Sequence, residues 1–391
     1  MNCIFLSPHF PTQYHRFCQQ LKIAGANVLG IGDAAYDELS PAVRASLTEY
    51  YRVDRMADYD ELLRACGYFT HKYGKIDRID SLNEFWLSTE ARLRDDFNVV
   101  GLRQKDIPAV RHKSEMKKKF LEADVPVAPG RIVESLADAR KFIKQIGYPV
   151  VAKPDAGVGA LHTYRLDNDE DLERFFDRKP EVDYIIEGFV KGTIYSYDGL
   201  TDRDGKPVFI TSHVFSQGIM ETVNEGRHLS YYSLRRIPMA LQKAGIRCLK
   251  AFDIRESFFH IEFFHTAKNE FTALEVNMRP PGGFTTDMFN YACDIDIYRI
   301  WAELVAKGEH KVSFERKYLC CYASRKEDIS YLHSHEEIIE QYGADICQVD
   351  QVPGVFASAL GELGYIFRTE RMDQLQEIIR FIHQIDEERE A

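Results

Sequence analysis

Short apolar runs alternate with amphipathic segments through the N-terminal part of the chain. Strand-like runs lie at residues 3–7, 28–31 and 76–81, and helical patterns lie at residues 16–22, 58–72 and 89–96. Such alternation is typical of a parallel α/β sheet, and it predicts a small α/β domain over residues 1–106. The loop at residues 7–11 lacks the glycine pattern of a dinucleotide-binding turn, so NAD binding is not expected there.

The pattern changes after Pro108. The expected elements that follow are a helix at residues 112–123, a linker strand at 125–129, a helix opened by Ser135, and strands near 149–154, 163–166 and 184–187. We expect these elements to form a small, lid-like subdomain over residues 107–191. Together with the first domain they define a multidomain protein of mixed α/β and α+β class.

The remainder of the chain is predicted to contain two further units. Residues 192–309 are rich in β-prone segments, and Asp202-Arg203-Asp204-Gly205 is expected to turn a hairpin between two of them. Residues 310–391 alternate strands with a final helix at 372–385, and we expect them to form a small C-terminal α+β domain.

Residues 273–277 have polar side chains at alternate positions, where an ordinary core strand would have apolar ones. If this segment is extended, Glu275 and Asn277 point to one side while Leu274 and Val276 point to the other. Carboxylate and carboxamide oxygens are ligands that hard divalent cations prefer. Arg279, two residues further on, could hold a phosphate or a carboxylate beside the metal.

A second β-prone segment, residues 258–264, carries Glu262 in its middle. A hairpin that turns through residues 268–270 would place Glu262 beside Glu275, and two neighbouring acids are costly without a cation between them. The alternative is an ordinary edge hairpin with both acids in solvent, which this motif alone would favour.

Two more segments have phosphate-binding or base-binding character. Residues 147–160 form an apolar strand that ends at Lys153 and opens into a loop with Gly157 and Gly159, whose backbone N–H groups could approach a polyphosphate. Residues 183–192 form a buried-looking strand that runs into a break, where backbone groups could bind the edge of an adenine ring. Ordinary turns at the ends of core strands are the alternative for both.

Taken together and in this order, these segments resemble the ATP-grasp superfamily, especially its carboxylate–amine ligases, the biotin carboxylases and the carbamoyl-phosphate synthetases. The resemblance covers about residues 1–310, and the combination is more specific than any one motif. It implies that the residues at 107–309 form a two-part ATP-grasp domain. The resemblance assigns the site residues as nucleotide ligands Lys113, Lys153, Gly157, Gly159, Glu187, Phe189 and Val190; metal ligands Glu262, Glu275 and Asn277; and catalytic residues Lys153 and Arg279.

The resemblance also implies a flexible flap over the phosphates at residues 155–162. One position departs from the pattern, because Ile194 occupies the place where the family often has a glutamate that contacts the ribose. Asp198 or Glu225 could supply that contact instead. Glu84 lies at a strand-end loop that could contact the acceptor substrate, but a solvated acid is the preferred interpretation.

Composition limits the class of protein. The formal net charge is −11, which disfavours a nucleic-acid or anionic-membrane partner. No run of apolar residues is long enough to cross a bilayer, and the N-terminus reads as a strand instead of a signal peptide. The eight cysteines show no zinc-site spacing and are interpreted as reduced core residues. We therefore expect a cytoplasmic protein, with a homodimer left open.

These observations predict an enzyme that uses ATP and Mg²⁺, or Mn²⁺, to activate a carboxylate as an acyl phosphate for attack by an amine or another nucleophile. An amino acid is one candidate for the carboxylate substrate. The partners are then small molecules. Two alternatives stay open, namely activation of bicarbonate as in the biotin carboxylases, and a nucleotide-binding regulatory protein without turnover. His260 shares a strand face with Glu262, so it could order that ligand or be an ordinary strand histidine.

Overall fold

The structure is a computed structural model that describes residues 1–157, 162–216, 218, 222, 226–308 and 313–386. Its N-terminal region is a four-stranded parallel sheet in the order β3-β2-β1-β4. Its elements are β1 (Asn2–Leu6), α1 (His15–Ile23), β2 (Asn27–Gly32), α2 (Pro41–Ser46), β3 (Glu49–Arg52), α3 (Tyr59–Tyr73), β4 (Arg78–Asp80) and α4 (Leu87–Asp96). The predicted parallel α/β region is confirmed.

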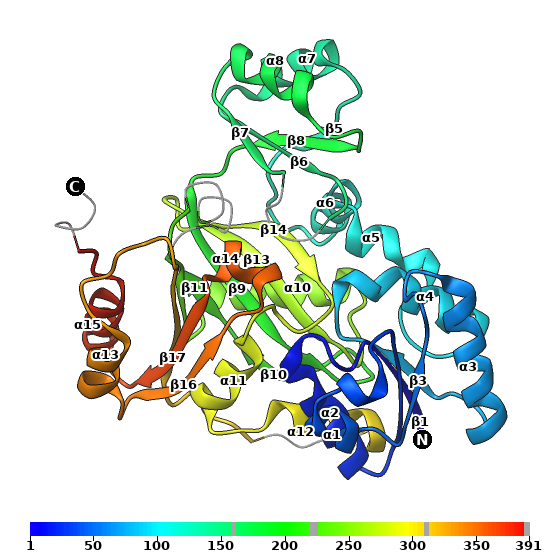
Figure 1. The fold of residues 1–391 in the computed structure, drawn as a ribbon. Helices are drawn as coiled ribbons and strands as arrows, with labels where there is room; N and C mark the ends of the chain where they lie inside the picture. Colours follow the sequence, from blue (N-terminus) through cyan, green and yellow to red (C-terminus); the bar gives the residue numbers. More distant parts are fainter. Residues whose placement is uncertain (158–161, 217, 219–221, 223–225, 309–312, 387–391) are drawn as a thin grey trace.

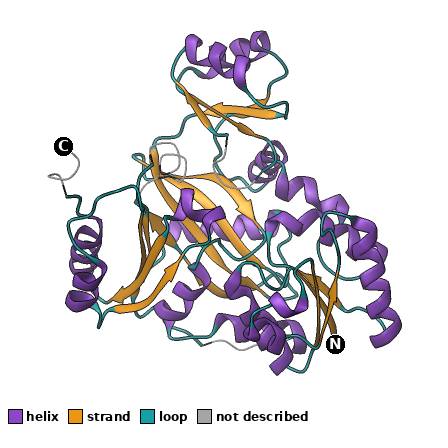
Figure 2. Ribbon diagram, viewed as in Figure 1, coloured by secondary structure: helices purple, strands orange, loops and turns teal. Residues whose placement is uncertain are grey.

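The lid-like unit stands apart from the rest of the chain (Figure 1). Helices α5 (Ile107–Arg111) and α6 (Lys113–Glu122) lead into an antiparallel sheet in the order β5-β8-β6-β7. Its elements are β5 (Gly130–Ile132), α7 (Leu136–Ile146), β6 (Val150–Pro154), β7 (Tyr164–Leu166), α8 (Asp169–Arg178) and β8 (Tyr184–Gly188). Figure 2 shows α7 and α8 on the side of the sheet that faces away from the remaining structure.

The largest sheet runs in the order β14-β13-β9-β11-β12-β15-β17-β16, and β10 pairs with β9. Its strands are β9 (Gly192–Thr201), β10 (Pro207–Thr211), β11 (His213–Phe215), β12 (Ser230–Ser233), β13 (Phe258–Thr266), β14 (Phe271–Asn277), β15 (Leu319–Arg325), β16 (Ile346–Gln351) and β17 (Leu363–Thr369). The accompanying helices are α10 (Met239–Ala251), α11 (Thr285–Cys293), α12 (Ile297–Lys307), α13 (His335–Tyr342), α14 (Gly354–Leu360) and α15 (Met372–His383). The hairpin turn expected after β9 is present, with the Asp202 carboxylate accepting bonds from the backbone N–H groups of Asp204 and Lys206.

The C-terminal strands do not form a sheet of their own. β15 pairs with β12 on one side and with β17 on the other, so the segment expected as a separate unit at residues 310–391 continues the large sheet. All residues of β15 are buried, which explains why this strand needs a partner on each edge. An alternating pattern identifies a strand but does not reveal which strand it pairs with, and the division of the chain into four domains stays a proposal.

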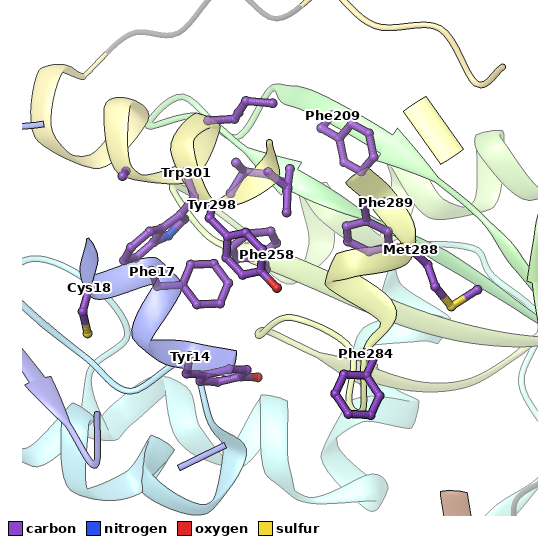
Figure 3. Close-up of a cluster of buried hydrophobic side chains, with 14 of the residues drawn as sticks. Tyr14, Phe17, Cys18, Phe209, Phe258, Phe284, Met288, Phe289, Tyr298 and Trp301 are labelled. Atoms are coloured by element: carbon purple, nitrogen blue, oxygen red, sulfur yellow. The ribbon is translucent and has the colours of Figure 1, made fainter. Parts of the chain in front are cut away.

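The main hydrophobic core joins the N-terminal sheet to the large sheet (Figure 3). Phe17 of α1 lies with its ring centroid 4.7 Å from that of Tyr298, 5.2 Å from that of Trp301 and 5.7 Å from that of Phe258. All eight cysteines carry free thiols and seven are buried, in agreement with their interpretation as reduced core residues. None of the helices in the described ranges is long and apolar enough to span a membrane.

The position of Phe17 between two regions leads to a stability prediction. We expect Phe17→Ala to lower the free energy of unfolding by about 3–5 kcal/mol, because it removes a buried aromatic ring and leaves a cavity. Urea denaturation followed by circular dichroism measures this change. Ile23→Ala, in the same helix but at a side chain 69% exposed, is the control and should change stability by less than about 1 kcal/mol. A loss for Phe17→Ala no larger than the control would contradict the proposed core contact.

Candidate active site

One cavity of about 930 Å³ gathers nearly all of the predicted site residues. The predicted residues that line it are Lys113, Lys153, Gly157, Glu187, Phe189, Val190, Glu262, Glu275, Asn277 and Arg279. Gly159 and half of the predicted flap, residues 158–161, lie outside the described residues, and His162 at the end of the flap is exposed. The lining residues come from the lid sheet, from α6, from the large sheet and from the N-terminal region, so this cavity lies where these parts of the chain meet.

The two acidic strands pair as the sequence predicts. In the β13–β14 hairpin, Glu262 lies opposite Glu275, and His260 lies opposite Asn277. The Asn277 amide donates to Glu275 Oε1 at 3.1 Å. Burial alone would raise the pKa of Glu275, but the nearby Lys113 and Lys153 ammonium groups outweigh it and lower that pKa. The strand face therefore presents two carboxylates and one amide to the cavity.

This donor set fits a hard divalent cation. Carboxylate and amide oxygens match Mg²⁺, which uses few protein ligands and keeps several of its waters. Glu262, Glu275 and Asn277 line the cavity on paired strands and provide the candidate ligands. Softer metals are disfavoured because this set has neither a thiolate nor an imidazole.

Glu84 was interpreted from sequence as a solvated acid, and this interpretation is wrong. It begins a short 3-10 turn after β4, where the Asn83 side chain accepts a bond from Phe85 N–H, and its side chain turns into the cavity with 8% exposure. Arg279 Nε donates to Glu84 Oε2 at 3.0 Å. Burial raises the pKa of Glu84 despite this arginine, and the nearby Glu275 adds to that rise. The sequence could not reveal this contact, because it joins residues 195 positions apart.

A second lysine of α6 contributes to the cavity and was missed from sequence. Glu187 Oε1 lies 2.5 Å from Lys153 Nζ, and Glu187 Oε2 lies 2.7 Å from Lys117 Nζ. Lys117 also donates to the Ala128 carbonyl at 2.9 Å. Burial would raise the pKa of Glu187, but the two lysines outweigh it and lower that pKa to about 2. Lys117 follows Lys113 by four residues on a predicted helix, and that shared helix face was the available signal.

The carboxylate of Glu187 is thus engaged by lysines, and its contact with an adenine base stays a proposal. The neighbouring hinge residue Phe189 lies under the Arg165 guanidinium, at 4.6 Å from the ring centroid. Phe189 N–H donates to the Pro149 carbonyl, while Val190 lines the cavity beside it. The break at the end of β8 therefore presents an apolar surface on which a flat ring could lie.

Asp155 fastens the lid to the start of α6. Its Oδ1 accepts from Ser114 N–H at 2.8 Å, its Oδ2 lies 2.8 Å from His112 Nδ1, and its carbonyl accepts from Lys113 N–H at 2.8 Å. On the other side of this contact, Lys113 Nζ donates to the Gly157 carbonyl at 3.3 Å. The lysine expected at the nucleotide is therefore held beside the start of the predicted flap.

Asp198 was considered as a substitute ribose contact, but it is fully buried and does not line the cavity. His260 Nδ1 lies 2.5 Å from Asp198 Oδ1, and His213 Nδ1 lies 2.8 Å from Asp198 Oδ2. Burial would raise the pKa of Asp198, but these histidines lower it to about 2. Burial would lower the pKa of His260, but Asp198 raises it to about 10. Glu225, the other substitute, lies outside the described residues.

His260 also contacts the metal-ligand face. Its Nε2 lies 3.2 Å from Glu262 Oε1, while its Nδ1 is held by Asp198. The ring therefore orients Glu262 from behind, in the way that hydrogen-bonded neighbours orient metal ligands elsewhere. Of the two interpretations of His260 drawn from sequence, the geometry favours the one in which it orders a ligand.

Comparisons with known proteins bear on the family that the chain resembles. Residues 146–287 match the family described as the ATP-grasp domain. The chain is similar to the L-arginine-specific L-amino acid ligase of Bacillus subtilis, with 25% identity over 250 residues, which are 58% of this chain and 59% of that protein. The matched region thus spans less than two thirds of this relative.

Solved structures share the whole fold. An L-amino acid ligase from Bacillus licheniformis aligns with a TM-score of 0.74 at 14% identity, covering 97% of this chain and 96% of that one. The biotin carboxylase domain of a Hydrogenobacter thermophilus 2-oxoglutarate carboxylase, solved with MgADP, ADP and bicarbonate, aligns with a TM-score of 0.68 at 16% identity, covering 98% and 90%. The match over residues 146–287 confirms the resemblance to the ATP-grasp superfamily that the sequence shows.

The buried ion-pair cluster at Glu187 leads to a prediction. Glu187→Gln should lower the free energy of unfolding by about 3–5 kcal/mol, because it leaves two buried ammonium groups without a carboxylate. Lys117→Met should cost less, because Glu187 keeps Lys153 as a partner. Chemical denaturation of both variants measures this difference.

The control for the cluster is Lys119→Met, which breaks the surface pair of Lys119 with Glu122 on the same helix. It should change stability by at most about 1 kcal/mol. We expect the Lys117→Met/Glu187→Gln double variant to lose less unfolding free energy than the sum of the losses in the two single variants, since the residues are coupled. Strict additivity would show that the cluster does not act as a unit.

Proposed function

We propose that the protein is an ATP- and Mg²⁺-dependent ligase that activates a carboxylate as an acyl phosphate for attack by an amine or another nucleophile. One observation carries the proposal: the paired acids Glu262 and Glu275 share a cavity with Lys113, Lys153 and Arg279. Paired acids of this kind need cations, and lysines at the other wall need anions. A metal–polyphosphate complex supplies both.

Each group in the cavity has a defined task in this reaction. Glu262, Glu275 and Asn277 would hold Mg²⁺, which when bound offsets the negative charge of the phosphates. Lys113 and Lys153 add fixed positive charge beside the transferred phosphoryl group. The Arg279 guanidinium is held by Glu84 and donates to the Pro280 carbonyl, so it is fixed in place to bind the carboxylate and the oxyanion that forms on it.

The identity of the carboxylate is the open part of this proposal. An amino acid is supported by the likeness to L-amino acid ligases in sequence and in fold. Bicarbonate is the second candidate, supported by the likeness to a biotin carboxylase domain that was solved with bicarbonate. ADP release measured with a panel of amino acids and with bicarbonate separates these from a regulatory protein without turnover, which would release no ADP with any of them.

The metal-ligand assignment is tested at Glu275. We expect Glu275→Gln to abolish ADP release while leaving the thermal unfolding midpoint close to that of the wild type, because the change removes ligand charge and keeps the shape of the side chain. Glu270→Gln, at an exposed position where the same hairpin turns, is the matched control and should retain full turnover. Magnesium-dependent turnover of Glu275→Gln near the wild-type rate would overturn the assignment.

The phosphate assignment is tested at Lys153. We expect Lys153→Ala to weaken ATP at least about tenfold more than adenosine, since the ammonium group should contact phosphates and not the base. Isothermal titration calorimetry with both ligands measures the difference. Lys268→Ala, which removes an exposed lysine of the hairpin turn, should leave both affinities unchanged. If Lys153→Ala weakens ATP and adenosine equally, the lysine does not lie at the phosphates.

A further inference from the structure

The cavity has two ends that differ in charge. The end formed by α6, the lid and the β13–β14 hairpin carries the charged residues described above. The other end is lined by the loop after β1, by β11 and β12, by the loop before α11, and by α14. We call this second end the apolar chamber, and its aromatic residues are Phe10, Tyr14, Phe215, Tyr231, Phe284 and Phe356.

The apolar chamber carries no Asp, Glu or Lys side chain on its described walls. Among the described residues that these elements contribute to the lining, the one Arg is Arg279, which lies where the chamber meets the charged end. Several of its polar groups are bonded to other protein groups, whereas His213 of β11, which contacts Asp198 through Nδ1, has no hydrogen-bond partner at Nε2. The Tyr231 hydroxyl lies 2.9 Å from Thr285 Oγ1, and the Gln13 amide donates to the Gly283 carbonyl at 2.8 Å. A charged group placed in this chamber away from Arg279 would therefore find no described carboxylate, ammonium or guanidinium group as a counter-charge.

Aromatic contacts build the chamber from distant parts of the chain. Phe10 of the N-terminal loop stacks on Phe356 of α14, with ring centroids 5.5 Å apart. Phe215 of β11 stacks on Tyr231 of β12, with ring centroids 5.0 Å apart. The walls are thus large apolar surfaces set by packing. They form a pocket of the kind that holds the apolar body of a small ligand.

The apolar chamber adjoins the arginine at the charged end. Burial raises the pKa of Tyr14, and the Arg279 guanidinium lies near enough to oppose that rise. The Gln13–Gly283 bond also joins the chamber wall to the glycine-rich segment that follows Arg279. A molecule with its carboxylate at Arg279 would therefore extend its remaining atoms into the apolar chamber.

Two exposed apolar side chains also line the cavity. Val355 at the start of α14 is 74% exposed and Phe85 in the turn after β4 is 66% exposed, and both line the cavity. Large apolar side chains this exposed lose contact with water only when something covers them. A ligand with an apolar body that reaches the mouth would cover both.

From these observations we propose that the carboxylate substrate has an uncharged, apolar body, which occupies the apolar chamber while its carboxylate lies at Arg279. This proposal rests on the proposed function and names the substrate class for it. Acidic and basic side chains are excluded because they would be buried without a partner. Branched aliphatic and aromatic groups are favoured because they bury more apolar surface.

The test uses hydroxylamine, so the natural nucleophile need not be known. Hydroxylamine attacks the acyl phosphate, and the products are a hydroxamate and inorganic phosphate. Wild-type protein with MgATP is assayed with norleucine, phenylalanine, glutamate and lysine, and with butyrate, hexanoate, 3-phenylpropionate and succinate. We expect the apolar members to react with kcat/KM at least about 100-fold above their charged counterparts, and hexanoate or norleucine to exceed shorter homologues about tenfold per methylene.

The chamber itself is tested with Val355→Glu. Val355 is exposed, so the substitution should not disturb folding, yet it places a carboxylate at the chamber. It should lower kcat/KM for the best apolar substrate at least about tenfold and raise that for lysine. The matched control is Met239→Glu, at an apolar residue 72% exposed at the start of α10 and outside the cavity, which should change neither value.

A binding measurement separates this proposal from the proposed function. Calorimetry with 3-phenylpropionate and succinate, in the presence of Mg²⁺ and a non-hydrolysable ATP analogue, requires no turnover. If 3-phenylpropionate binds more tightly than succinate and Val355→Glu weakens that binding, the apolar chamber is supported even when no hydroxamate forms. The absence of hydroxamate would overturn the ligase reaction but not the substrate class. Equal or tighter binding of succinate, no binding of either acid, or hydroxamate formed as fast from glutamate as from norleucine, would overturn the substrate class.

Discussion

The electrostatic balance at the β13–β14 hairpin governs the arrangement around it. Two partly buried carboxylates on neighbouring strands repel each other, and the positive charges that act most strongly on Glu275 come from Lys113 of α6 and Lys153 of the lid sheet. Lys113 lies on α6 and Lys153 lies on the lid sheet, so both elements must be in place beside the hairpin for these two charges to offset the acids. The catalytic face is therefore a property of the assembled chain, and none of its units would hold these charges in place alone.

Behind this face, a second set of charges fixes the ligands. Asp198 holds His213 and His260, and His260 in turn contacts Glu262. Each of these groups is buried and bonded, so the strand face is rigid on the side away from the cavity. On the opposite wall, Glu187 neutralises one of its two lysine neighbours and leaves the pair with a net positive charge. One wall is thus built for cations and the other for anions.

The sequence predicted those parts of the site that depend on local pattern. The alternation at residues 273–277 and the acid at 262 predicted that Glu262 lies beside Glu275, but their direct pairing also depends on a shift of register between Glu262 and Phe263 that the pattern does not reveal. Contacts between distant segments were not predictable in this way. Glu84 meets Arg279 only because the N-terminal sheet packs on the large sheet, and the partner of β15 is chosen by tertiary packing. Burial and pairing of this kind change the role of a residue without changing its local pattern.

The bonds made by Asp155 join a loop of the lid to the first turn of α6. A helix start normally relies on a cap from the residue just before it, and such a cap contributes about 0.5–2 kcal/mol. Here the capping carboxylate lies 41 residues away, directly after β6 of the lid sheet. Any outward swing of the lid would uncap α6 at the residue next to Lys113, so the free energy of opening includes the fraying of that helix turn.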